Sequence, residues 1–356
     1  MARNRLALLL TLLALSLTGL VSSLPRLYYL VRLPFVWQAS SAGSVISQEH
    51  DQFDVTFTAY EANYSSSDSG QRVLIPPILH HIHLGSRPPQ RDWLVARELC
   101  LKHHASWSTF IWNDQSAEKL VREEYPHLYS TWKSYPYIIQ RVDALRYMIL
   151  QKHGGEHVLD DTCLELTVST GVILDHDLEC KRSLEPLRQF DFVAPAAYPA
   201  GISIGMMLSS PGNSYVKALV DNLPLYNLRW FYLPYVTVMF SSGCHYASTV
   251  YTLQSNRSSL RILYGPPDKP RMHMLNGPVN TPLFRHIGSS SWHNSDARFI
   301  WLFKSLDQRS LFAALVFVLF ALITMILCCL HRTQGRPLDE EHEGTMTVSK
   351  LSTKSA

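Results

Sequence analysis

Two aspartates, Asp175 and Asp177, follow the short apolar run Val172–Leu174 and are separated only by His176. An apolar run of this kind is typical of a buried strand, so both carboxylates would stand where that strand ends. Hard divalent cations bind carboxylate oxygens, and a bound cation can neutralise the charge of a diphosphate leaving group. At this spacing Asp175 and Asp177 can share one metal ion and one sugar, which makes both of them candidate catalytic residues.

A second group of charged residues lies upstream of these aspartates. Arg141, Asp143 and Arg146 belong to a segment with helical apolar spacing, and Gly154-Gly155 follows it. A guanidinium fits phosphate oxygens bidentately, so Arg146 is a candidate for binding the diphosphate. An Asp-x-Asp triplet alone is more often an ordinary exposed loop. Here the strand before it, the upstream charges and the double glycine favour a substrate site.

The elements that would position these residues alternate between strands and helices. The pattern predicts strands over 73–84, 108–112 and 172–174, and helices over 93–104, 116–125 and 141–152. Such alternation indicates an α/β fold with a mostly parallel central sheet. The net charge of +3 is too small and too dispersed to indicate nucleic-acid binding.

Several motifs together resemble those of one glycosyltransferase family. The run RVDALRY, followed by Gly-Gly and ILDHD, resembles the signature R-A-D-x-x-R-Y…G-G-x-Y-x-D-x-D. Two fungal groups share that signature: the inositol-phosphoceramide mannosyltransferases and the mannosyltransferases that initiate N-glycan outer chains. Four further runs of this chain resemble motifs of the family: IPPILH at 75–80, WND at 112–114, LPYVTVMFSSG at 233–243 and HIGSSSWH at 286–293. The resemblance extends over about residues 73–303.

The resemblance implies a GT-A fold, GDP-mannose as the donor and Mn²⁺ or Mg²⁺ as the cofactor. It implies that Asp175 contacts the sugar and the metal and that Asp177 ligates the metal. His286 would lie near the metal and the diphosphate. The remaining motif residues would bind the donor: Arg141, Asp143, Arg146, Trp292 and His293.

One departure from the family pattern is an insert at residues 156–171, between Gly154-Gly155 and the strand before Asp175. The insert contains its own acidic pair, Asp160-Asp161. Aligning the motif on that pair loses the first aspartate of the triplet and the Lys-Arg-x-Leu-x-Pro register after it, so we place the site at Asp175 and Asp177. Two interpretations of the insert stay open: a genuine surface loop, and an unspliced intron retained in the gene sequence.

A second departure concerns the acceptor. The sphingolipid branch of the family has G-I-S-N-D after the core, whereas this chain has Gly201-Ile202-Ser203-Ile204-Gly205. Two polar groups expected near the donor or the acceptor are therefore missing, and the acceptor is less determined than the donor.

Two uncharged apolar runs, at 6–24 and 311–330, each have the length of a transmembrane helix. Basic residues at their outer flanks place residues 1–5 and 331–356 in the cytosol. A luminal stem would cover 25–70 and the catalytic domain 71–305. A cleaved signal peptide is the alternative for the first run. Sequons at Asn63 and Asn256 agree with a luminal domain of the Golgi or ER membrane. The cysteines allow a disulfide and show no zinc-binding spacing.

These patterns predict a membrane-bound glycosyltransferase that transfers mannose from GDP-mannose to inositol-phosphoceramide. A lipid acceptor suits a domain held to the bilayer at both ends. Two alternatives stay open: an α-mannosyltransferase that acts on N-glycans or other glycans, and an inactive homologue that is a subunit of a transferase complex. The expected partners are the nucleotide-sugar donor, a sphingolipid or glycan acceptor, the membrane and a regulatory subunit, without nucleic acid.

Overall fold

The chain divides into two compact units, Met1–Lys304 and Ser305–Ala356, and the sheets and the site belong to the first. The computed structural model describes residues 2–62, 64, 72–152, 170–230, 233–288 and 295–297, together with Ser310, Ala313, Phe317, Phe320, Ala321 and Thr324. The α-helices are α1 (Ala2–Ser41), α2 (Gln48–Asp51), α3 (Arg91–His103), α4 (Asp114–Glu124), α5 (Pro126–Ser134), α6 (Ile138–Gln151), α7 (Ser214–Tyr226), α8 (Pro234–Ser241) and α9 (Cys244–Thr252). The strands are β1 (Ile78–Ile82), β2 (Ser108–Trp112), β3 (Val172–Leu174), β4 (Leu178–Cys180), β5 (Phe192–Pro195), β6 (Met206–Ser209), β7 (Leu260–Leu263), β8 (Val279–Asn280) and β9 (Phe284–His286).

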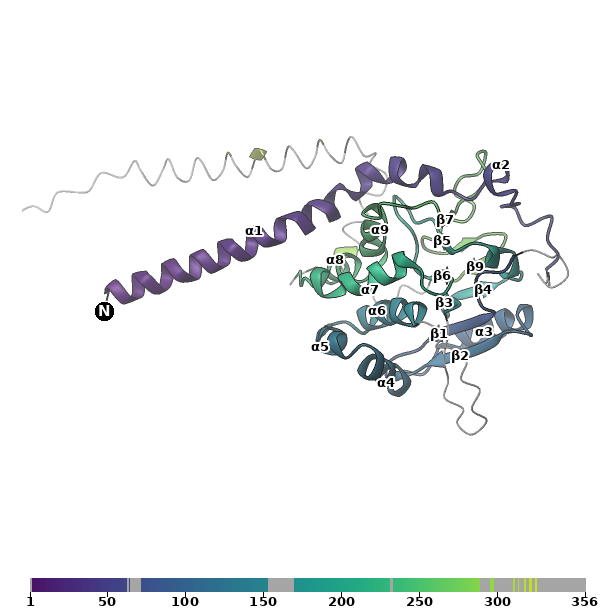
Figure 1. Cartoon of the computed structure of the whole chain (residues 1–356), viewed down its shortest axis with the longest axis horizontal. Helices are drawn as coiled ribbons and strands as arrows, with labels where there is room; N and C mark the ends of the chain where they lie inside the picture. The colour runs from purple at the N-terminus through teal and green to yellow at the C-terminus, as the bar shows by residue number, and fades with distance from the viewer. Residues whose placement is uncertain are drawn as a thin grey trace, which may run out of the picture. The chain divides into compact units, whose positions relative to one another are not determined.

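The central sheet has six strands in the order β2-β1-β3-β6-β5-β7. Strand β6 pairs antiparallel with β3 and β5, and the other pairings are parallel. The predicted α/β fold with a mostly parallel sheet is therefore confirmed. Because β1 and β3 run side by side in the same direction, their carboxyl ends lie at one edge of the sheet (Figure 1). Asp175 follows β3 directly at that edge.

Alternating residues of the central strands supply two hydrophobic cores. Ile173 packs into the core beneath α6, α7 and α9, whereas Val172 and Leu174 face the core on the opposite side, near α3. This follows from the two-residue repeat of a strand, which sends successive side chains to opposite faces. Figure 1 shows the helices around α6 and α7 on one side of the sheet and α3 on the other.

A second, three-stranded antiparallel sheet, in the order β4-β9-β8, adjoins the site. Strand β4 begins at Leu178, immediately after Asp177, and pairs with His286 of β9. A disulfide joins Cys100 of α3 to Cys180 of β4. The sequence allowed a disulfide, and this bond anchors the strand that follows the two aspartates.

Residues that the sequence predicted to form a stem are packed into the first unit. Leu30, Leu33 and Trp37 of α1 are buried in the core that includes α9. Further along, Val45 bridges Ile262 of β7, and Phe53 is fully buried. The structure therefore differs from a 25–70 stem, because this segment buries large apolar side chains.

Within the described part of the chain, no helix combines the length and the apolarity that a bilayer crossing requires. The predicted span at 6–24 falls within α1 and stays a prediction. Most of the other predicted span, 311–330, lies outside the described residues.

Candidate active site

Backbone hydrogen bonds from two distant loops fix the turn that carries the aspartates. The Asp175 amide donates to the carbonyl of Gly205, 2.8 Å away, and the Ile287 amide donates to the carbonyl of Asp177, 2.9 Å away. The turn is therefore held on one side by the 203–205 loop and on the other by the residue after β9.

Arg146 of α6 is a buried cation between two carboxylates. Its Nη1 forms an ion pair with Asp175 Oδ1 and donates to the Ile204 carbonyl at 3.1 Å, while its Nε lies 3.6 Å from Asp143 Oδ1. Burial lowers the pKa of Arg146, but the two carboxylates raise it more, and the net shift is upward. The side chain therefore keeps its positive charge at the site.

Asp143, one helical turn before Arg146, is almost fully buried and accepts a hydrogen bond from Ser242 Oγ at 3.1 Å. Burial raises the pKa of Asp143 to about 7, against the opposing charge of Arg146 and with a further upward contribution from Asp175. Burial likewise raises the pKa of Asp175, although Arg146 opposes the shift.

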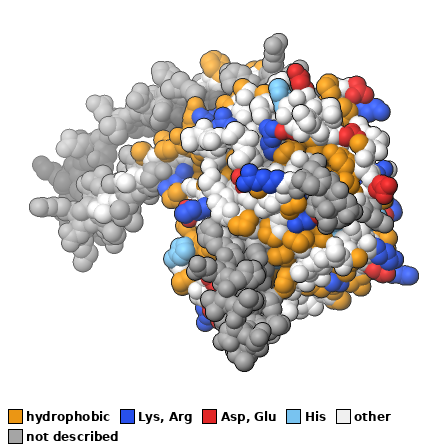
Figure 2. Space-filling model, turned by 45° about the vertical axis from the view of Figure 1, so that its right-hand side comes forward, with side chains coloured by type: hydrophobic (Ala, Val, Ile, Leu, Met, Phe, Trp, Pro, Cys, Tyr) orange, Lys and Arg blue, Asp and Glu red, His pale blue; other side chains and the backbone are white. Residues whose placement is uncertain are grey.

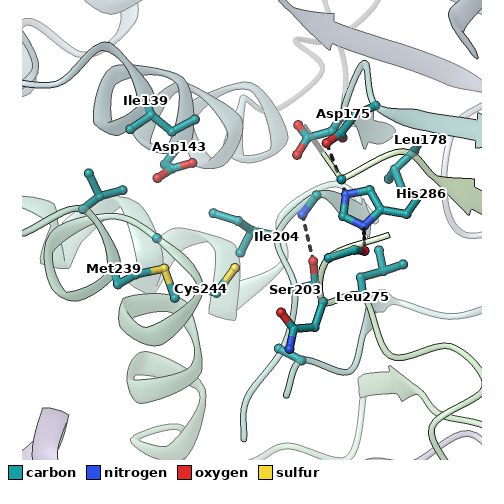
Figure 3. A pocket seen from close by; sticks show the side chains of 18 of the residues that line it. Ile139, Asp143, Asp175, Leu178, Ser203, Ile204, Met239, Cys244, Leu275 and His286 are labelled. Atoms are coloured by element: carbon teal, nitrogen blue, oxygen red, sulfur yellow. Dashed lines mark hydrogen bonds and ion pairs between the residues drawn. The ribbon is translucent and has the colours of Figure 1, made fainter. Parts of the chain in front are cut away.

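His286 joins the site from the small sheet. Its Nε2 lies 3.2 Å from Asp177 Oδ2, and its Nδ1 is 2.7 Å from the carbonyl of Gly277, to which the Nδ1–H donates. Burial lowers the pKa of His286, but the hydrogen bond and the negative charge of Asp177 outweigh it, so the pKa is raised. Figure 3 shows Asp143, Asp175 and His286 around one pocket, with Ile204, Met239 and Cys244 beside them.

The donor set at this turn suits a divalent cation that also binds substrate. Among the described residues, no group of three His, Cys, Asp or Glu side chains is arranged to hold a metal ion on its own. A hard cation such as Mg²⁺ is commonly held by one or two carboxylates together with substrate phosphates, which needs no such group. Asp177 and Asp175, with His286 against Asp177, fit that mode of binding.

The two aspartates separate two pockets. The first has a volume of about 200 Å³ and is lined by Asp143, Ser203, Tyr198, Gly277 and His286, among others. The second has a volume of about 620 Å³ and lies against the residues after β1 and the start of α3. Both are bordered by Ile139, Arg146, Asp175 and Asp177. A molecule in either pocket can therefore reach the same carboxylates and the same guanidinium.

His176 and Trp93 line the second pocket and were not predicted as site residues from the sequence. The two rings are stacked, with centroids 6.0 Å apart and planes 17° apart. His176 is buried, and its ring nitrogens have no hydrogen-bond partner in the part of the chain that the structure describes. The central position of the Asp-x-Asp triplet was the available signal for His176.

Arg141, a predicted donor-binding residue, does not line either pocket. The Arg141 guanidinium turns away to the carbonyl of Lys133, 3.2 Å distant, and stacks over the ring of Trp132. Trp292 and His293 lie outside the described residues, as does the acidic pair of the insert, Asp160-Asp161. Of the insert, only Thr170 and Gly171 are described, and both are buried.

The Ile204-Gly205 departure lies directly on Asp175. A Cβ at Gly205 would come 3.1 Å from Asp175 Oδ2, and Gly205 also supplies the carbonyl that fixes the Asp175 amide. Ile204 contributes its carbonyl to Arg146. The substituted residues therefore still position the site through their backbones.

Comparison with known proteins gives the family. Residues 90–166 match the family described as glycosyltransferase sugar-binding region containing DXD motif. This chain is a glycosyltransferase. This match and the fungal relatives described next together confirm the resemblance drawn from the sequence motifs.

Its relatives include three fungal enzymes. Inositol phosphoceramide mannosyltransferase 3 of Schizosaccharomyces pombe is 29% identical over 73% of this chain and 67% of the relative. Mannosyl phosphorylinositol ceramide synthase CSH1 of Saccharomyces cerevisiae is 31% identical over 67% of this chain and 57% of the relative. Mannosyl phosphorylinositol ceramide synthase SUR1 of the same yeast is 30% identical over 67% of this chain and 56% of the relative. The glycosyltransferase thus spans little more than half the length of the two Saccharomyces relatives.

A solved structure, the PaToxG glycosyltransferase, is 13% identical and superposes with a TM-score of 0.35 over 53% of this chain and 72% of that chain. That likeness is too distant to support an argument. The family match ends at residue 166, before Asp175 and Asp177, so it does not select between the two acidic pairs.

Proposed function

We propose that this glycosyltransferase transfers mannose from GDP-mannose to inositol phosphoceramide, with Mn²⁺ or Mg²⁺ bound at Asp177 and Asp175. The observation that carries the proposal is the position of the two aspartates and Arg146 between two pockets. Transfer requires the donor and the acceptor to meet at the same charged groups. In this arrangement, both pockets are bordered by Arg146, Asp175 and Asp177.

The second pocket suits the nucleoside diphosphate of the donor. It lies outside the carboxyl ends of the neighbouring parallel strands β1 and β3, where open α/β sheets bind ligands. Arg146 borders this pocket and would face the diphosphate. The metal, when bound, would neutralise the charge of the departing GDP.

The first pocket suits the transferred sugar and the acceptor hydroxyl. Of the two pockets, Asp143 lines only this one. We therefore assign Asp143 to hydroxyl groups of the sugar or the acceptor rather than to the nucleotide. The relatives' names, with inositol phosphoceramide in them, support the choice of acceptor.

The proposed location is the luminal side of the Golgi or ER membrane. The Cys100–Cys180 disulfide supports an oxidising compartment, since such bonds are rare in the cytosol. The exposed sequon at Asn256 agrees with it. A membrane-embedded acceptor would require the domain to work at the bilayer, with a regulatory subunit as a further proposed partner.

The test is mannose transfer by the purified full-length protein. GDP-mannose, Mn²⁺ and vesicles that contain inositol phosphoceramide should yield a mannosylated lipid, and chelation of the metal should stop the reaction. Transfer only to an N-glycan acceptor would support the glycan alternative. Neither transfer nor hydrolysis of GDP-mannose would support the inactive-subunit alternative.

A further inference from the structure

An exposed arginine lies at the edge of the first pocket. Tyr198 forms part of the pocket wall, and the guanidinium carbon of Arg271 lies over its ring, 5.0 Å from the centroid. Arg271 is exposed, and among the described residues it forms no ion pair with a carboxylate. A guanidinium that stacks by its face keeps the N–H groups at its edge available to a ligand.

Two loops fix this position. The turn that carries Tyr198 is closed by a hydrogen bond from the Ala197 amide to the Gly201 carbonyl at 2.9 Å. Gly201 has φ +104°, and a Cβ there would lie 2.3 Å from Ser248 Oγ, so the turn requires glycine. The loop that carries Arg271 is tied to the first by the Leu275 amide, which donates to the Ala196 carbonyl at 3.0 Å.

Three other cations near the site already have partners. Arg146 is paired with Asp175 inside the site. Arg285, next to His286, lies 3.4 Å from Glu179, and Lys181 Nζ donates to the Thr281 carbonyl at 2.8 Å. Figure 2 shows one face of the molecule, on which acidic and basic side chains are interspersed.

We propose that Arg271 binds the phosphate of the acceptor at the mouth of the first pocket. This inference rests on the proposed function, because an inositol phosphoceramide carries an anionic phosphodiester between the inositol ring and the lipid. The inositol ring would enter the pocket toward Asp175, and the phosphodiester would stay at the rim against the guanidinium edge. Guanidinium groups bind phosphate oxygens with paired, charge-assisted hydrogen bonds.

The experiment compares Arg271→Gln and Arg271→Lys with the wild type, using vesicles that contain inositol phosphoceramide. Hydrogen bonds to charged groups are worth about 10-fold or more in affinity, so Arg271→Gln should raise the acceptor KM about 10-fold. The kcat and the rate of GDP-mannose hydrolysis without acceptor should stay unchanged. Arg271→Lys should recover part of the loss, because it restores the charge but not the paired geometry.

Lys269→Gln is the matched control, because Lys269 is exposed on the same loop. It removes the same charge and should leave the acceptor KM unchanged. A soluble comparison isolates the phosphate: the wild type should prefer glycerophosphoinositol to myo-inositol as acceptor, and Arg271→Gln should lose that preference.

Two results would overturn the inference. An unchanged acceptor KM in Arg271→Gln, with normal transfer by the wild type, would refute the role of Arg271 and leave the proposed function intact. A lower kcat and slower GDP-mannose hydrolysis, with the acceptor preference retained, would mean that Arg271 only supports Tyr198. No transfer by the wild type to any phosphoinositol acceptor would refute the proposed function and this inference together.

Discussion

Asp175 and Asp177 are neighbours in sequence but have different partners. Asp175 faces Arg146 of α6, whereas Asp177 faces His286 of β9. Asp175 therefore connects the site to the helix beneath the sheet, and Asp177 connects it to the small sheet. Asp175 is paired with a buried arginine, whereas Asp177 lies against a histidine, which is itself a possible metal ligand.

Replacing Asp177 by asparagine should abolish transfer without unfolding the protein. The change removes one negative charge from the metal site at nearly constant volume, and the charge stabilisation of a metal ion is worth several kcal/mol, or about 100-fold or more in rate. Mannose transfer and Mn²⁺ affinity, measured by calorimetry, should both fall, with an unchanged melting temperature.

Asp160→Asn is the matched control, because Asp160 belongs to the rival acidic pair in the insert. It should leave the transfer rate nearly unchanged. An essential Asp160 beside a dispensable Asp177 would show that the motif had been placed on the wrong pair.

His104, at the end of α3, should make the protein sensitive to acid. Its Nδ1–H donates to the Cys100 carbonyl at 2.6 Å, and its Nε2 accepts from the Leu184 amide at 2.9 Å, so both nitrogens are used by the neutral ring. Burial lowers its pKa from the ordinary 6.5 to about 4.

The unfolded chain therefore binds a proton that the folded chain does not as the pH falls from about 6.5 to about 4. Stability should be full above pH 6.5 and should decrease by roughly 2 kcal/mol from this residue by pH 5. Urea unfolding at pH 7.5 and pH 5 measures the change. His104→Gln, which keeps a donor and an acceptor but does not titrate, should show a shallower decrease. An equal decrease in both proteins would rule out this role.

At the scale of elements, the site depends on what precedes and follows the strand β3. The Cys100–Cys180 disulfide joins α3 to β4, which follows Asp177 directly. Replacing both cysteines by alanine should cost about 2–5 kcal/mol in the free energy of unfolding, the usual cost of losing a native disulfide. Urea unfolding measures it, and the reduced wild type should match the variant. Equal stability of all three forms would argue against the bond.

Deleting residues 156–171 should raise both the soluble yield and the transferase activity of the protein. A Cβ at Gly171 would lie 2.5 Å from the Ile78 carbonyl, so the position before Val172 accepts only glycine. In the deletion variant, Gly155 takes this position, and the double glycine leads directly into β3. The insert also carries several apolar residues, which would favour aggregation in an exposed loop.

Soluble yield and metal-dependent mannose transfer of both forms decide the matter. The deletion combined with Gly155→Ala should lose the gain, because the alanine Cβ would meet the Ile78 carbonyl. Equal or higher activity of the full-length form would mean that the insert is a genuine part of the enzyme.

At the scale of the whole molecule, the proposed luminal location can be tested by glycosylation. Asn256 is exposed, and its side chain accepts hydrogen bonds from Ser258 of its own sequon, which leaves the amide at the surface. Protein expressed in a eukaryotic host should become smaller on endoglycosidase treatment, and Asn256→Gln should remove part of that shift. The sequon at Asn63, outside the described residues, should account for the rest. The absence of a glycan from Asn63 and also from Asn256 would contradict a luminal domain.

The sequence by itself determined the elements and the family. Strands β2 and β3 have the predicted bounds, because their apolar runs are short and end in turn residues. Helices α3, α4 and α6 were predicted within a few residues. Asp143 and Arg146 could also be placed together from the sequence, since residues three apart share a helix face. Arg141, five residues before Arg146, points elsewhere for the same reason.

Only the tertiary structure decided which distant residues meet. His286 reaches Asp177 because β9 pairs with β4, a pairing across long sequence separation that no local pattern encodes. The choice of Cys180 as the partner of Cys100 depends on a Cα separation of 4.7 Å that folding creates. The division into two pockets, with Asp143 on one side and His176 on the other, likewise arises from how the loops pack around the end of β3. Local periodicity reports which face of an element is buried, whereas contacts between elements depend on the path of the whole chain.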